Sequence, residues 1–184
     1  GTTFIKANSN TNNIAIGTEA GENAQRTLAT AVGRQAGSTN QGNSAVAVGN
    51  QAGQVSQGAN SVAIGVQSAQ TTQGTHSVAV GYQAANEGQN NFSVAIGSNA
   101  GCRAQDGAVA VGSSAGRDGQ GDDAIAIGPS AGCASQGANS VAIGTSAGCT
   151  GQNASAVAVG VEAGRVSQNN FAVSVGREAG CNAQ

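Results

Sequence analysis

The chain alternates β-branched and small side chains in short runs that recur along its length. Apart from Thr30 and Ser174, which replace one position each, every run ends in the pattern [Val/Ile]-Ala-[Val/Ile]-Gly, as at 62–65, 94–97 and 141–144. After the first run, Ala or Ser always precedes the first branched residue. Alternation with a period of two is typical of a β-strand whose two faces have different surroundings. The pattern therefore predicts one short strand in every run.

The runs repeat at an interval of about sixteen residues. The glycine that ends the pattern recurs eleven times, at Gly17, Gly33, Gly49, Gly65, Gly81, Gly97, Gly112, Gly128, Gly144, Gly160 and Gly176. One interval, from Gly97 to Gly112, is fifteen, and we place the missing residue in a turn. A period of this length is typical of solenoids in which each repeat forms one coil. We predict an all-β, parallel β-solenoid of eleven rungs over residues 13–184, after a lead-in segment at 1–12.

The alternation also raises the question of which face is inside. We expect the Val and Ile columns to form a thin core, because they carry the larger apolar side chains. The small residues would then form a smooth outer stripe, on which a second chain can pack closely. The residues predicted to form this contact between chains are Ser61, Ala63, Ala79, Ala95, Ala126, Ala142 and Ala158. A single coil buries too little apolar surface to offset its conformational entropy, so we expect a homo-oligomer, a trimer in particular.

A glutamine recurs eight residues after the glycine in every repeat. Stacked amides can hydrogen-bond to the copies above and below, which predicts a ladder along the rod. The alternative is a solvated turn residue. The predicted ladder includes Gln57, Gln73, Gln89, Gln105, Gln120, Gln136 and Gln152.

Composition limits the functions that the chain can have. The 184 residues include 30 Gly, one Pro and no Met or Trp, and only 9% are charged, with a net charge of −2. The chain therefore lacks the basic footprint of a nucleic-acid-binding protein, and no apolar stretch is long enough to insert into a membrane. Because it begins with Gly1 and contains no Met, we expect it to be a segment of a longer chain.

Few residues point to catalysis. His76 is the only histidine, the serines recur as repeat positions, and neither a P-loop nor a dinucleotide fingerprint is present. The densest acidic stretch, 118–123, could supply oxygen ligands for a cation, but we interpret it as a solvated turn. We expect no enzymatic activity, no metal and no cofactor.

The four cysteines share one repeat position. Cys102, Cys133, Cys149 and Cys181 each lie five residues after the glycine. Cys133 and Cys149 are on adjacent rungs, roughly 4.8 Å apart, within the Cα range of a disulfide. Three interpretations remain open: free buried thiols that pack as small hydrophobes, one bridge between Cys133 and Cys149, or cross-links between chains of a fibre.

Two runs resemble a known repeat. The segments at 60–65 and 139–144 read NSVAIG, which resembles the head repeat of trimeric autotransporter adhesins of the YadA type. The resemblance implies a left-handed parallel β-roll, a homotrimer and a surface that binds host or matrix proteins. Similar repeats occur in phage and giant-virus fibre proteins. The sixteen-residue period and the recurrent glutamine depart from the head pattern, which leaves a fibre variant or an independent solenoid open.

These observations predict a non-catalytic structural or adhesive segment of a surface fibre, located outside the cell or on a virion. The alternative is an ice-binding solenoid that uses its flat Ala/Ser/Gly face. Against this alternative, no column is rich in Thr.

Overall fold

The structure is a computed structural model that describes residues 5–8, 12–104 and 106–182. Within these ranges it contains sixteen strands and no helix. The strands are β1 (Ile5–Asn8), β2 (Asn13–Ile16), β3 (Thr30–Val32), β4 (Val46–Val48), β5 (Val62–Ile64), β6 (Val78–Val80), β7 (Val94–Ile96), β8 (Val109–Val111), β9 (Asp118–Gln120), β10 (Ile125–Ile127), β11 (Ala134–Gln136), β12 (Val141–Ile143), β13 (Thr150–Gln152), β14 (Val157–Val159), β15 (Val166–Gln168) and β16 (Val173–Val175).

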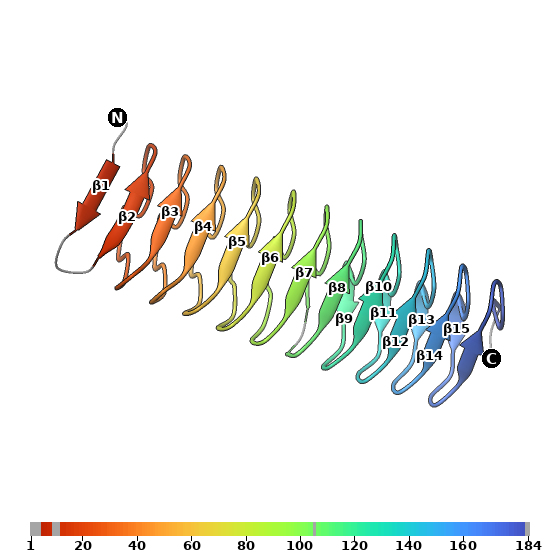
Figure 1. Ribbon diagram of the computed structural model, residues 1–184. Helices are drawn as coiled ribbons and strands as arrows, with labels where there is room; N and C mark the ends of the chain where they lie inside the picture. Colours follow the sequence, from red (N-terminus) through yellow and green to blue (C-terminus); the bar gives the residue numbers. More distant parts are fainter. Residues whose placement is uncertain (1–4, 9–11, 105, 183–184) are drawn as a thin grey trace.

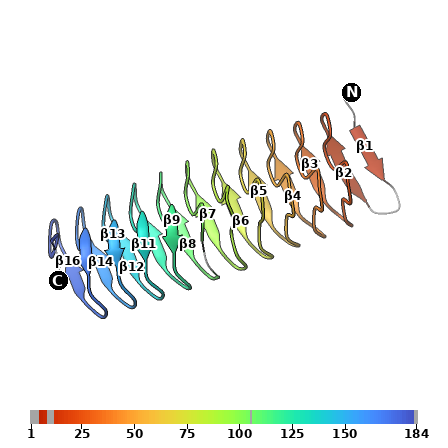
Figure 2. The same ribbon diagram turned by 180° about the vertical axis from the view of Figure 1, so that it is seen from behind.

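The coils stack into a straight rod with β1 at one end and β16 at the other (Figures 1 and 2). One long sheet runs in the order β1-β2-β3-β4-β5-β6-β7-β8-β10-β12-β14-β16, and its strands from β2 onward pair in parallel. β1 pairs antiparallel with β2. A second sheet, β15-β13-β11-β9, lies on the other side of the coils. The prediction of an all-β parallel solenoid is therefore confirmed.

Equivalent residues of neighbouring coils lie side by side. Val62 pairs with Val78, Ala63 with Ala79 and Ile64 with Val80, and the same register holds along the long sheet. Because the repeat length matches one coil, each repeat position becomes a column of side chains along the rod.

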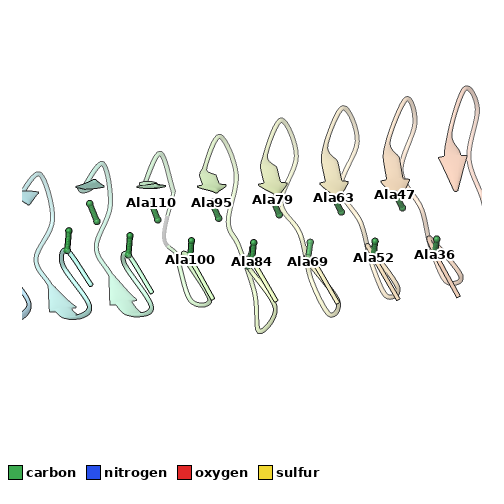
Figure 3. Close-up of a cluster of buried hydrophobic side chains, with 14 of the residues drawn as sticks. Ala36, Ala47, Ala52, Ala63, Ala69, Ala79, Ala84, Ala95, Ala100 and Ala110 are labelled. Atoms are coloured by element: carbon green, nitrogen blue, oxygen red, sulfur yellow. The ribbon is translucent and has the colours of Figure 1, made fainter. Parts of the chain in front are cut away.

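The core of the rod is made of alanine, which reverses the prediction of a Val and Ile core. Figure 3 shows two rows of alanine side chains pointing toward each other across the interior of each coil. Ala47 and Ala52, from opposite sides of one coil, are both fully buried. By contrast, Ile64 and Ile96 on the strands are 40% and 41% exposed.

The space between the two facing alanine rows has room for small side chains only, which explains the reversal. The two sides of the coil are close enough for facing alanine methyl groups to form the core. A branched side chain in either row would overpack this space. The alternation was read correctly, but the larger side chains point outward.

The short repeat also differs from the prediction. Ala104 pairs with Gln89 on one side and with Gln120 on the other, so it occupies the position that glutamine takes in other coils. The backbone N–H of Asn90 donates to the carbonyl of Ala104, as the equivalent Gly74 does to Gln89. The deletion therefore lies before the glutamine position, on the side of the coil that carries the second sheet, and not in the following turn.

Candidate functional site

The outward side chains of the long sheet form a continuous apolar surface, which we call the branched face. It consists of the two Val or Ile side chains on each strand from β2 to β16, with Thr30 as the one polar member. Its members are half-buried or exposed, up to 66% for Val175 at the end. Eleven strands about 4.8 Å apart make a strip roughly 50 Å long and 10 Å wide. Few monomeric proteins expose a contiguous apolar patch of this size.

The residues predicted to form a contact between chains do not lie on the surface. All seven have no exposed surface: Ser61, Ala63, Ala79, Ala95, Ala126, Ala142 and Ala158. They belong to the interior of their own chain, so a partner cannot touch them. The prediction of these contact residues is wrong because the small side chains point into the coil and the branched side chains point outward.

The glutamine column lies inside the rod. Gln73 is 2% exposed, and its Nε2 donates to the carbonyl oxygens of Val62 at 2.9 Å and Ser77 at 3.3 Å. It also donates to Oε1 of Gln89 at 3.3 Å. Gln57 likewise donates to Oε1 of Gln73 at 3.2 Å. Gln73 thus joins two successive strands of the long sheet as well as a neighbouring amide.

The bond to the backbone is the feature that the column shares. Nine glutamines donate to the carbonyl eleven residues earlier, on the preceding strand: Gln25, Gln41, Gln57, Gln73, Gln89, Gln120, Gln136, Gln152 and Gln168. Gln105 lies outside the described residues. Because buried carbonyls have no water available, these bonds matter more than the amide-to-amide contacts for which the ladder was predicted.

A second, outer amide ladder was missed by the sequence reasoning. Gln51 Nε2 donates to Oε1 of Gln35 at 3.0 Å, and Gln67 Nε2 donates to Oε1 of Gln51 at 3.2 Å. At one end of the ladder, Gln83 Nε2 donates to Oε1 of Gln67. At the other end, Gln35 Nε2 donates to a carboxylate oxygen of Glu19. Its signal was present, since Gln occurs two residues after the glycine in four consecutive repeats.

The cysteines share one column with two arginines. The register of β9, β11, β13 and β15 places Arg117, Cys133, Cys149 and Arg165 on successive coils. All four cysteines are free thiols and half-buried. Cys133 and Cys149 are therefore direct neighbours on adjacent coils.

Burial changes the acidity of two of these thiols. It raises the pKa of Cys102 above its ordinary value of 9.0, and the nearby Glu87 adds to the effect. Burial also raises the pKa of Cys133. The neighbouring Cys149 thiol raises it further, whereas Arg117 lowers it. Both thiols are therefore protonated near neutral pH.

An exposed aromatic pair lies on the turn that precedes the long sheet. His76 stacks on Phe92 of the next coil, with ring centroids 5.3 Å apart and an angle of 10° between the planes. Both residues have a positive φ, 57° for His76 and 58° for Phe92. Asn60, at the equivalent position of the preceding coil, has a φ of 55°. A bulky residue in this conformation is unusual, and Phe92 remains 65% exposed.

The acidic stretch at 118–123 does not gather around one point. Asp118 forms an ion pair with Arg117 at 2.9 Å, whereas Asp122 and Asp123 are exposed on the following turn. Among the described residues, no three His, Cys, Asp or Glu side chains are grouped so that they could hold a metal ion.

The fold and the branched face define a β-solenoid repeat protein with one extended apolar side. Within it, residues 56–84 match the YadA head domain repeat, in two copies. This match confirms the resemblance inferred from the NSVAIG segments. Neither the curated proteins nor the solved structures contain a significant match to the chain. In the described part of the chain, no helix is long and apolar enough to cross a membrane.

Proposed function

We propose that this chain is a rigid structural or adhesive segment of a surface-exposed fibre, and that three copies pack around an axis through their branched faces. The single observation that carries the proposal is the branched face itself. A strip of this length and apolarity is costly to leave in water and is typical of an interface. The YadA head repeat at residues 56–84 supports a trimer and a location on a cell surface.

The proposal moves the contact between chains from the small residues to the branched ones. Side chains such as Ile64 and Ile96 project from flat, parallel strands at regular spacing, so three such faces can interdigitate along the whole rod. The regular columns also keep the rod straight, as a spacer or a display shaft requires. An adhesive role, with a host-surface or matrix protein as the ligand, uses the outer turns that remain exposed in such a trimer.

The chain mass in solution tests the trimer. We expect sedimentation equilibrium to give three times the 17.5 kDa mass of the chain. The double variant Ile64→Asp, Ile96→Asp places charges on the branched face and is expected to be monomeric. Its matched control is Val66→Asp, Val161→Asp, because these valines are 46% and 45% exposed but lie outside the strands. The control is expected to remain a trimer.

A monomeric wild-type chain would overturn the proposal, and so would a control variant that dissociates as readily as the test variant. Circular dichroism of each variant establishes that it retains its β-structure. Binding of the trimer to immobilised matrix proteins then tests the adhesive role separately.

The ice-binding alternative is weakened by the structure. It relied on a flat Ala/Ser/Gly face, and the Ala and Ser columns of that face are interior. No other observation favours it.

A further inference from the structure

We infer that Cys133 and Cys149 are the site of a reversible disulfide that joins two successive coils within one chain. The inference goes beyond the proposed fibre function and does not depend on the trimer. It rests on the register of the second sheet, on the spacing of adjacent coils and on the residues that flank the two cysteines.

The register brings the two cysteines side by side. Ala134 pairs with Thr150, and the N–H of Ala134 donates to the carbonyl of Cys149 at 2.8 Å. The two residues therefore occupy the same position on adjacent coils, with Cα atoms about 4.8 Å apart. This separation lies within the range of about 4.4–6.8 Å that a disulfide spans.

The other two cysteines are not placed to compete. Arg117 lies on the coil between Cys102 and Cys133, and Arg165 lies on the coil between Cys149 and Cys181. A separation of two coils, about 9.6 Å, is too long for a bridge. The Cys102 thiol instead donates to the carbonyl oxygens of Gln83 and Asn99, each at 3.5 Å. One pair among the four cysteines is thus selected by position.

The column is accessible to an oxidant. The four cysteines are half-buried, and the pair directly precedes β11 and β13 of the second sheet. This sheet lies on the other side of the coil from the branched face, so packing through that face leaves the thiols uncovered (Figures 1 and 2). The flanking Arg117 favours the thiolate of Cys133, in opposition to the effect of burial.

The reaction requires an external disulfide, for example glutathione disulfide. The Cys133 thiolate attacks one sulfur of the oxidant, forms a mixed disulfide and releases one glutathione thiolate. The Cys149 thiolate then attacks Sγ of Cys133 and releases the second. The protein loses two protons and two electrons, and glutathione disulfide becomes two glutathione molecules. The product closes a loop across one coil, which restrains the unfolded chain.

The test is oxidation of the full chain with glutathione disulfide, followed by alkylation, denaturation and peptide mapping. Trypsin cleaves after Arg117 and Arg165, so residues 118–165 form one peptide that contains both cysteines. We expect this peptide to be two hydrogens lighter and to resist alkylation, while Cys102 and Cys181 remain alkylated. Oxidation should raise the midpoint of thermal unfolding by roughly 5–10 °C.

Matched variants separate this site from the rest of the column. The variant Cys102→Ser, Cys181→Ser should keep both the bridge and the thermal shift, and Cys133→Ser should lose both. Four reactive thiols after oxidation would overturn the inference. Bands at multiples of the chain mass on non-reducing, denaturing electrophoresis would also overturn it, in favour of cross-links between chains.

Discussion

The α-carbon of Gly81 lies against the carbonyl of Gly97 on the next coil. A Cβ built on Gly81 would stand 2.6 Å from that oxygen, and the φ of Gly81 is +134°. The same relationship recurs along the column of pattern glycines, for example between Gly17 and Gly33. The glycine that defines the repeat therefore sets how closely successive coils can approach.

This contact predicts a large effect for Gly81→Ala. The variant should lose several kcal/mol of unfolding free energy, since it combines backbone strain of about 1–3 kcal/mol with a clash against fixed backbone. Gly88→Ala is the control, because Gly88 has the same φ of +134° but nothing within 4 Å of its Cβ position. Chemical denaturation measures the free energy of unfolding of both variants. Equal losses would show that the contact between coils contributes nothing.

The alanine core predicts that a larger side chain inside the coil is harmful. Ala79→Val should lower the free energy of unfolding by about 1–3 kcal/mol, because the fully buried Ala79 faces the opposite row of alanines. Ala154→Val adds the same atoms on an exposed turn and should be nearly neutral. If Ala79→Val were neutral or stabilising, the branched side chains and not the alanines would form the core.

The hydrogen bonds of the inner glutamines predict that Gln73→Glu loses stability to an extent that depends on pH. At pH 7 the carboxylate cannot donate to the carbonyls of Val62 and Ser77, so we expect a loss of about 3 kcal/mol or more. At pH 4 a protonated carboxyl can donate again, and part of the loss should be recovered. Gln67→Glu, on the half-buried outer ladder, should change stability little. Similar losses at the two positions, or a loss at Gln73 that does not change with pH, would contradict this account.

The buried thiols predict that stability falls at alkaline pH. In the folded chain the pKa values of Cys102 and Cys133 lie above 9.0, so the folded state holds these protons more tightly than the unfolded state. Their contribution is therefore fully present below pH 9.0 and is lost as the pH rises through the folded values. Thermal unfolding of the reduced protein between pH 7 and 10.5 measures the fall. The variant Cys102→Ala, Cys133→Ala should show a shallower fall, and an unchanged slope would contradict the assignment.

Much of the fold could be predicted from the sequence because the repeat is nearly exact. The recurrence of Val62, Ala63, Ile64 and Gly65 at sixteen-residue intervals indicated the strand, the coil and the parallel stacking. The column of glutamines and the shared position of the cysteines followed from the same alignment. These features depend only on periodicity, which is a property of the chain itself.

The faces could not be predicted in the same way. Alternation shows that two faces differ, but the distance between the two sides of a coil decides which side chains fit between them. That distance is short, since a Cβ built on Gly53 would stand 3.3 Å from the Cβ of Ala47 on the other side of the coil. In this rod it admits the methyl group of Ala79 and leaves Val78 and Val80 outside. The sequence likewise did not show that Ala104 takes the glutamine position in the short repeat, because this depends on its pairing with the neighbouring coils.

The sequence by itself thus determined the period, the strands, the columns and the resemblance to an adhesin head repeat. Only the tertiary structure decided that alanine is the core, that the branched face is available to partners and that the glutamine amides bind backbone carbonyls. The physical reason is that a repeat specifies which residues share an environment, whereas the width of the folded coil specifies what that environment is.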